Sequence, residues 1–159
     1  MNVSIRRSIA ATTLSLVLAL PALVGADMGS SGGSWSAGPT VDADYSAAVK
    51  AIEAKEWRKA IDLLNKSVAR NDKNADAHNL LGYSERKRGN LDVAFKHYER
   101  ALALDPKHRG AHEYVGEAYL QAGNVTKAEE HLARLDKLCT FGCSEYKELK
   151  TAIAVYKKQ

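Results

Sequence analysis

Residues 75–108 read ADAHNLLGYSERKRGNLDVAFKHYERALALDPKH, and similar segments lie directly before and after them. Ala60, Ala94 and Ala128 stand 34 residues apart and occupy equivalent places in the three segments. A fixed period of this length is typical of helical repeat arrays, in which each segment is one supersecondary unit. The periodicity therefore predicts an all-α protein built from three helical hairpins.

Each predicted hairpin turns at a short polar stretch. In the central segment, apolar residues fall into two runs at helical spacing, separated by residues 86–90. Gly89 is expected to supply the left-handed backbone that ends the first helix, and Asn90 to cap the second helix with its side chain. Gly123 and Asn124 repeat this pair 34 residues later, so the same turn is predicted there.

Small residues stand at fixed places inside the predicted helices. Gly82 and Gly116 are equivalent positions of two first helices, and Ala94 and Ala128 are equivalent positions of two second helices. We interpret them as sites where two helix backbones approach closely. Their expected role is packing rather than chemistry.

The period and its glycine, small and aromatic positions resemble the tetratricopeptide repeat (TPR) family. The best copy, residues 75–108, departs from the family at His78, in the place of an early tryptophan, and at Glu85, in the place of an aromatic residue. The copy at residues 109–139 has no closing proline, and the copy at residues 41–74 is the most degenerate. The matching positions of the best copy are Leu81, Gly82, Gly89, Ala94, Tyr98, Ala101 and Pro106. The resemblance implies a right-handed superhelical array of the three hairpins.

The last segment, residues 140–159, is expected to form a turn and a capping helix. From Ser144 onward, apolar residues recur at spacings of three, four and three, while lysines occupy the other side. A helical hairpin cannot bury its apolar stripe alone, so a stacked array needs an end cap. The chain is therefore predicted to contain seven helices.

The first 26 residues have the order of a cleaved export signal. Arg6 and Arg7 precede an apolar stretch over residues 9–20, and small residues follow at 24–26. The apolar stretch is well short of the roughly 20 residues that span a bilayer, so no stable membrane insertion is expected after cleavage. We expect a periplasmic protein, or a secreted one if the source is not Gram-negative.

Residues 27–40 are rich in Gly and Ser and are predicted to be a flexible linker.

Composition argues against a nucleic-acid partner. The formal net charge is +4, and loss of the two arginines of the signal would lower it to +2. A nearly neutral chain with interspersed charges gives little reason to expect binding to phosphate backbones.

Stacked hairpins leave a concave face made from the first helix of each pair, and its surplus side chains are binding candidates. Their mixed character suits an extended peptide or a helix of another protein, and Tyr83 and Arg86 are residue types found at binding hot spots. The alternative for Tyr45, Val49 and Ile52 is that they pack against the first hairpin or the linker. The nine candidates are Tyr45, Val49, Ile52, Asn79, Tyr83, Arg86, Glu113, Glu117 and Leu120.

Some TPR proteins clamp the C-terminal carboxylate of a partner with Lys and Asn side chains spread over successive repeats of this face. Here the third segment offers Glu113 and Glu117 instead. Both carboxylates would repel an acidic tail. We therefore do not expect that specificity on the concave face.

Cys139 and Cys143 are separated by three residues at the predicted turn into the capping helix. In an exported protein a close pair of this kind favours a disulfide, worth about 2 kcal/mol for so short a loop. Its role would be to fix the angle of the capping helix. The alternative is a small copper or thiol-redox carrier that uses the two thiols, because paired thiolates bind Cu(I).

The histidines do not complete a metal site in this interpretation. His131 is nearest to the cysteines in sequence, but it belongs to the body of a helix. His78 with His112, and His97 with His131, stand at 34-residue offsets, which makes them repeat positions. Equivalent positions on stacked helices are expected about 8–10 Å apart, too far to share a metal. We predict no metal site and no cofactor.

Motifs of catalysis are not found either. The sequence has no strand-turn-helix nucleophile setting, no glycine-rich phosphate loop and no His-Glu-x-x-His helix. We therefore expect an exported interaction module, an adaptor or assembly factor that binds another protein, and not an enzyme.

Overall fold

The computed structural model describes residues 42–140 and 142–159. The signal predicted for residues 1–26 and the linker predicted for residues 27–40 lie outside this part of the chain. Within it the structure contains seven α-helices and no strand. The prediction of an all-α repeat array with a final helix is confirmed.

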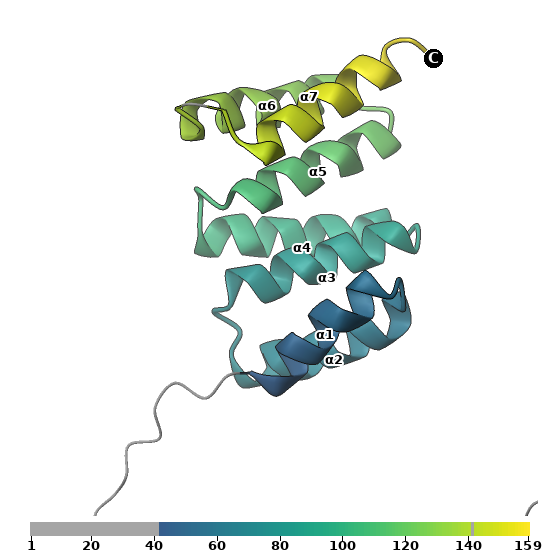
Figure 1. The fold of residues 1–159 in the computed structure, drawn as a ribbon, viewed down its shortest axis with the longest axis vertical. Helices are drawn as coiled ribbons and strands as arrows, with labels where there is room; N and C mark the ends of the chain where they lie inside the picture. Colours follow the sequence, from purple (N-terminus) through teal and green to yellow (C-terminus); the bar gives the residue numbers. More distant parts are fainter. Residues whose placement is uncertain (1–41, 141) are drawn as a thin grey trace, which may run out of the picture. The chain divides into compact units, whose positions relative to one another are not determined.

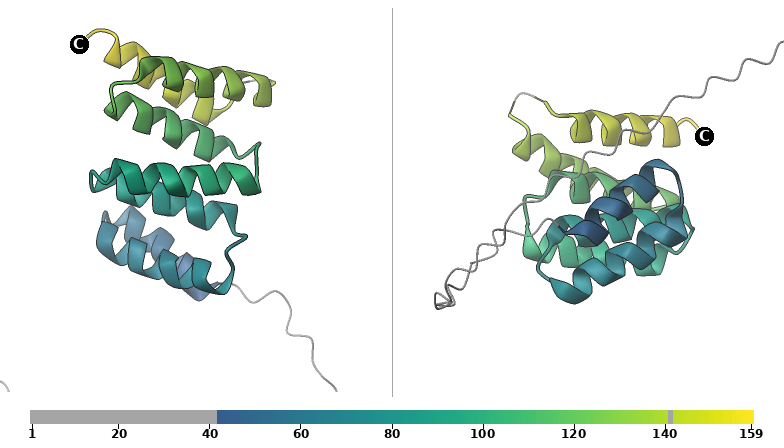
Figure 2. Two further views of the ribbon diagram at one scale, coloured as in Figure 1. Left: turned by 180° about the vertical axis from the view of Figure 1, so that it is seen from behind. Right: turned by 60° about the horizontal axis from the view of Figure 1, so that its bottom comes forward.

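The helices form three antiparallel hairpins followed by a single helix (Figure 1). Figure 2 shows the hairpins stacked one on the next, with α7 as the last layer. Their bounds are α1 Ala43–Glu53, α2 Trp57–Arg70, α3 Ala75–Lys87, α4 Leu91–Leu104, α5 Arg109–Gln121, α6 Val125–Leu138 and α7 Ser144–Tyr156.

Three buried clusters hold consecutive layers together. The first joins the α1–α2 hairpin to α3, and includes Leu64 and Leu81. The second joins α4 to α5 through Tyr98 and Val115. The third joins α5, α6 and α7 and includes Leu149. Each layer is therefore stabilised by side chains of the next one, as expected for a repeat array.

The turns within the hairpins use the left-handed backbone region. Gly89 has a φ of 86° and Gly123 a φ of 75°, as predicted. The first hairpin places Lys55 at the equivalent position with a φ of 58°. A side chain is disfavoured in this region, so this turn carries backbone strain that the two glycine turns avoid.

Capping by asparagine occurs at only one of the two predicted positions. The side chain of Asn124 accepts a hydrogen bond from the backbone N–H of Lys127 at 3.0 Å. The prediction for Asn90 is wrong, because its amide Nδ2 donates to Oε2 of Glu85 at 2.6 Å instead. Glu85 stands where the family has an aromatic residue, and its buried carboxylate engages the asparagine.

The two helical glycines are small for a different reason from the one expected. A Cβ atom on Gly82 would lie 2.6 Å from the ring of Tyr98, and one on Gly116 would lie 2.6 Å from a methyl carbon of Leu149. The close neighbours are therefore side chains rather than helix backbones. Gly116 makes room for the leucine through which α7 covers the array.

Histidines meet within hairpins rather than between them. Nδ1 of His78 lies 3.4 Å from Nδ1 of His97, and Nδ1 of His112 lies 2.9 Å from Nδ1 of His131. Both pairs join the first and second helices of one hairpin. Burial, followed by the neighbouring His112, lowers the pKa of His131 to about 4. Burial also lowers the pKa values of His97 and His112.

Replacing Lys55 with glycine should stabilise the protein. Glycine adopts a positive φ without steric cost, so Lys55→Gly is expected to raise the free energy of unfolding by about 1 kcal/mol. Urea denaturation followed by circular dichroism measures this difference. Lys55→Ala is the matched control, since it removes the charge and keeps the strain, and it should leave stability within about 0.5 kcal/mol. Equal effects of both variants would contradict the strain argument.

Acid should destabilise the fold through the histidine pairs. A group whose pKa is lower in the folded state than in the unfolded state binds more protons when unfolded, so stability is lost as pH falls. For His131 this loss of stability occurs as the pH falls from 6.5 to about 4. His131→Gln should reduce the loss of unfolding free energy between pH 7 and pH 4 by about 2 kcal/mol. Denaturation at both pH values measures it, and the pH 7 value isolates the packing cost of the substitution. A variant with the natural pH dependence would refute this origin of acid sensitivity.

Candidate functional site

Three aromatic rings form a continuous row across the array, which we call the aromatic band. The ring of Trp57, at the start of α2, lies 5.9 Å from the ring of Tyr83 on α3 in an edge-on arrangement. The ring of Tyr83 lies 4.7 Å from that of Tyr114 on α5. All three side chains are half-buried. The band therefore offers rigid aromatic surface that spans three layers.

Arg86 is buried beneath the rings of the aromatic band. Its guanidinium carbon lies 5.4 Å from the ring centre of Tyr83 and 5.9 Å from that of Tyr114. Nη2 of Arg86 lies 2.5 Å from Oε2 of Glu117, and the arginine side chain is only 2% exposed. Stacking and ion pairing together fix the guanidinium. Among the described residues its Nε has no hydrogen-bond acceptor.

The acidic end of the face is covered by α7. Glu113 on α5 is 4% exposed and lies beside Glu148 of α7. Burial, followed by hydrogen bonding and repulsion from Glu148 and repulsion from Glu117, raises the pKa of Glu113 well above its usual range. The same burial raises the pKa of Tyr114 to about 12. This end of the face therefore holds a neutral carboxyl group near pH 7.

Several predicted groove residues are part of the packing. Tyr45 and Ile52 pack against the core of the first hairpin, which favours the alternative interpretation for these two. Asn79 is 5% exposed, and its amide nitrogen lies 3.3 Å from where a Cβ atom of Gly110 would stand. Leu120 belongs to the core cluster of α5, α6 and α7. Neighbouring helices thus bury Asn79 and Leu120, together with Arg86 and Glu113, and partly bury Tyr45 and Ile52.

The predicted residues that remain partly accessible without belonging to a core cluster are Val49, Tyr83 and Glu117, whereas Tyr45 and Ile52 are partly accessible and packed on the first cluster. The structure adds two aromatic residues to Tyr83 that the sequence interpretation did not include. Trp57 begins a second helix, and the predicted face contained residues of first helices only. Tyr114 was missed because it is one residue away from the column that holds Glu113.

α7 also contributes to the face, beyond its predicted role as a cap. An open hollow of about 510 Å³ lies where α3, α5 and α7 meet. Its walls include the ion pair of Arg86 and Glu117 and the exposed Val155, which is 53% accessible. The complete lining is Arg86, Glu117, Leu120, Gln121, Ala152, Val155, Tyr156 and Gln159. An apolar side chain of a partner could rest here beside polar groups.

The cysteines lie between α6 and α7. Sγ of Cys139 is 2.04 Å from Sγ of Cys143, which is disulfide distance, and their Cα atoms are 5.5 Å apart.

His131 does not lie with the cysteines. It contacts His112 and stacks on Tyr119, and the ring centres of His131 and Tyr119 are 5.8 Å apart. Across residues 42–140 and 142–159, no group of three or more His, Cys, Asp or Glu side chains is arranged to hold a metal ion.

Two family models match the chain, and both are described as tetratricopeptide repeat. One covers residues 45–108 and the other residues 85–153. Together they cover well over half of the 159 residues. A comparison with curated proteins gave no significant match. None of the helices in the described part of the chain is long and apolar enough to span a bilayer.

Solved structures share the fold at low sequence identity. The Sgt2 TPR domain from Aspergillus fumigatus has a TM-score of 0.68 and 23% identity, over 76% of this chain and 79% of that one. The Yersinia enterocolitica type III secretion chaperone SycD, in complex with a peptide of the translocator YopD, has a TM-score of 0.62 and 22% identity over 72% and 87%. The second TPR domain of human RPAP3, in complex with an HSP70 peptide, has a TM-score of 0.64 and 18% identity over 73% and 93%. These structures share the stacked hairpins of this chain, and the two family matches show that it belongs to the tetratricopeptide repeat family.

Proposed function

We propose that this protein is an interaction module that binds a peptide or helix of another protein along the aromatic band. The observation that carries the proposal is the row of Trp57, Tyr83 and Tyr114, half-buried and in mutual contact across three layers. Tyr and Trp are enriched at binding hot spots because they offer large rigid contact area at low entropic cost. The ion pair beneath the rings holds them in place before a partner arrives.

Relatives of the same fold support this mode of action. SycD has been solved with a peptide of YopD, and a TPR domain of RPAP3 with an HSP70 peptide. In this chain the face holds the acidic side chains Glu113 and Glu117, of which the first is buried and the second is paired with Arg86. Its partner segment is therefore recognised by aromatic and apolar contacts along the band, with the hollow beside Val155 receiving a side chain.

We further propose that the module works outside the cytoplasm, as a periplasmic adaptor or assembly factor. The support is the signal-like order of residues 1–26 and the close pair of cysteines. Disulfides persist in oxidising compartments, where a short covalent loop is useful between a repeat array and its last helix. No catalytic step is part of this role.

Removing the central ring should abolish partner capture. Tyr83→Ala is expected to lower recovery of the partner in proximity crosslinking from living cells at least about tenfold, because it interrupts the band. Tyr83→Phe retains the ring and is the matched control. Val93→Ala, on the exposed side of α4, controls for loss of surface area. Undiminished capture by a folded Tyr83→Ala protein would contradict the proposal.

The cysteines should matter for stability and not for capture. Cys139→Ser opens the predicted loop, and we expect unfolding free energy to fall by about 2 kcal/mol while partner recovery is unchanged. Thermal melting with and without reductant measures the first effect, and the same crosslinking experiment measures the second. Loss of a bound metal or thiol-linked species with Cys139→Ser, and unchanged recovery with Tyr83→Ala, would favour the carrier interpretation.

A further inference from the structure

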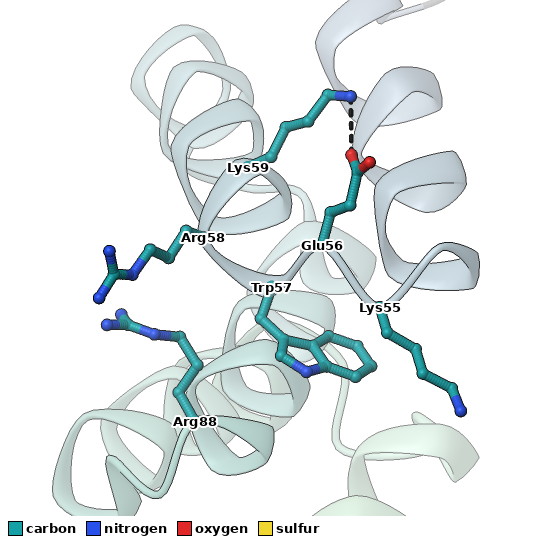
Figure 3. A pocket seen from close by; sticks show the side chains of 6 residues that line it. All are labelled: Lys55, Glu56, Trp57, Arg58, Lys59 and Arg88. Carbon is teal, nitrogen blue, oxygen red and sulfur yellow. Dashed lines mark hydrogen bonds and ion pairs between the residues drawn. The ribbon is translucent and has the colours of Figure 1, made fainter.

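A second hollow lies at one end of the aromatic band, and its lining is strongly basic. It has a volume of about 590 Å³ and is open to solvent. Figure 3 shows these side chains, which come from the turn between α1 and α2, from the start of α2 and from the residue that ends α3. We call this site the basic corner. Its lining residues are Lys55, Glu56, Trp57, Arg58, Lys59 and Arg88.

Half of the cations of the basic corner are uncompensated: Arg88 lies 3.8 Å from the carboxylate of Glu85, whereas Lys55 and Arg58 have no ion pair within the described residues. Four of the six lining residues are cations, and the one acid, Glu56, is paired with Lys59 at 2.7 Å. Arg58 and Arg88 line the same hollow, and in the view of Figure 3 their side chains extend toward the same side of it. Two such side chains favour an anion that can bridge them, because a carboxylate accepts parallel hydrogen bonds from a guanidinium.

The same place in the next repeat shows that this charge is not a property of the fold. A smaller hollow of about 350 Å³ lies there, and none of its lining residues is basic. Asp92 stands in the place of Arg58, and Val93 in the place of Lys59. The full lining is Gly89, Asn90, Leu91, Asp92 and Val93. The basic corner is therefore specific to the first hairpin.

Backbone strain provides an independent observation. Lys55 adopts a φ of 58°, whereas glycine occupies the equivalent turn positions at residues 89 and 123. A lysine in this conformation is destabilising, and strained residues cluster at sites where the side chain is needed. Here the strain places one more cation in the lining of the hollow.

We propose that the basic corner binds the carboxylates of an acidic segment of a partner protein. The proposal rests on the proposed function and names the chemistry of the segment. Trp57 belongs both to the corner and to the aromatic band, so an apolar side chain next to the acids can pack on its ring. The residues of the corner come from the turn before α2, from the start of α2 and from the residue that ends α3, and not from the first-helix positions of a C-terminal-carboxylate clamp.

The charges of the face favour a peptide over a nucleic acid. Phosphate backbones require a continuous basic track. Beyond Tyr83 such a track is interrupted, because Arg86 is buried and paired with Glu117, and Glu113 lies beside Glu148 of α7. A short acidic segment can meet the corner alone, whereas a polyanion would continue into these acids.

Trp57 itself reports on the corner. In a Trp35→Phe background it is the remaining tryptophan of the chain. The probe is a nonapeptide of three Glu-Glu-Leu units with blocked ends, titrated at low and high salt. We expect a saturable change in Trp57 emission that weakens with salt. Arg58→Gln/Arg88→Gln should raise the Kd about tenfold.

Matched variants separate binding from folding. Lys73→Gln/Lys96→Gln removes the same charge from exposed positions outside the corner and should leave the Kd within about twofold. Lys55→Gly should weaken binding of the acidic peptide while it stabilises the fold. A loss of binding in this variant therefore cannot arise from unfolding. No emission change with the acidic peptide, or an unchanged Kd in the arginine variant, would overturn the proposal.

Two further probes test the class of ligand. A nonapeptide of Lys-Lys-Leu units should not bind, and equal binding would show that charge is not recognised. A deoxythymidine decamer that bound more tightly than the acidic peptide would replace a protein partner with a nucleic acid. In crosslinking, loss of the partner in Tyr83→Ala but not in Arg58→Gln/Arg88→Gln would refute the basic corner and leave the proposed function intact. Loss in neither would refute the proposed function itself.

Discussion

A hairpin of two short helices has an apolar stripe that it cannot cover by itself, and the architecture follows from this constraint. Each buried cluster takes side chains from one layer and the next: Leu64 with Leu81, Tyr98 with Val115, and Leu135 with Leu149. Each of these clusters therefore extends across the boundary between two layers. The positions of binding side chains are fixed in the same way, because the aromatic band crosses the layers that these clusters hold together.

The polar interior is a second product of stacking. Arg86 on α3 reaches Glu117 on α5, so an ion pair joins consecutive layers beneath the aromatic rings. Histidine pairs join the two helices within a layer. Buried polar groups of this kind favour one register between helices, since a shifted register would leave charges and ring nitrogens without partners. A rigid face suited to recognition results from these contacts.

The sequence predicted the array well because its signals are local and repeated. A period of 34 residues and glycines at the turns determine where helices begin and end, and they require no knowledge of distant contacts. Asn90 was wrongly assigned as a cap because Glu85, five residues earlier, competes for its side chain. The binding face was harder to predict, since exposure depends on the next layer. Glu113 lies on a first helix as expected, yet the last helix buries it.

The neutral carboxyl group of Glu113 changes the field that an approaching partner meets. If Glu113, Glu117 and Glu148 were all ionised, Arg86 would neutralise one of them. This end of the face would then carry two excess negative charges. Because burial beside Glu148 raises the pKa of Glu113, and Arg86 pairs with Glu117, this end of the face carries less negative charge than a count of its glutamates suggests. Protonation of Glu113 thus lowers the negative charge of the face without a bound cation. It reduces the long-range repulsion of an acidic segment on its way to the opposite end, where the arginines lie.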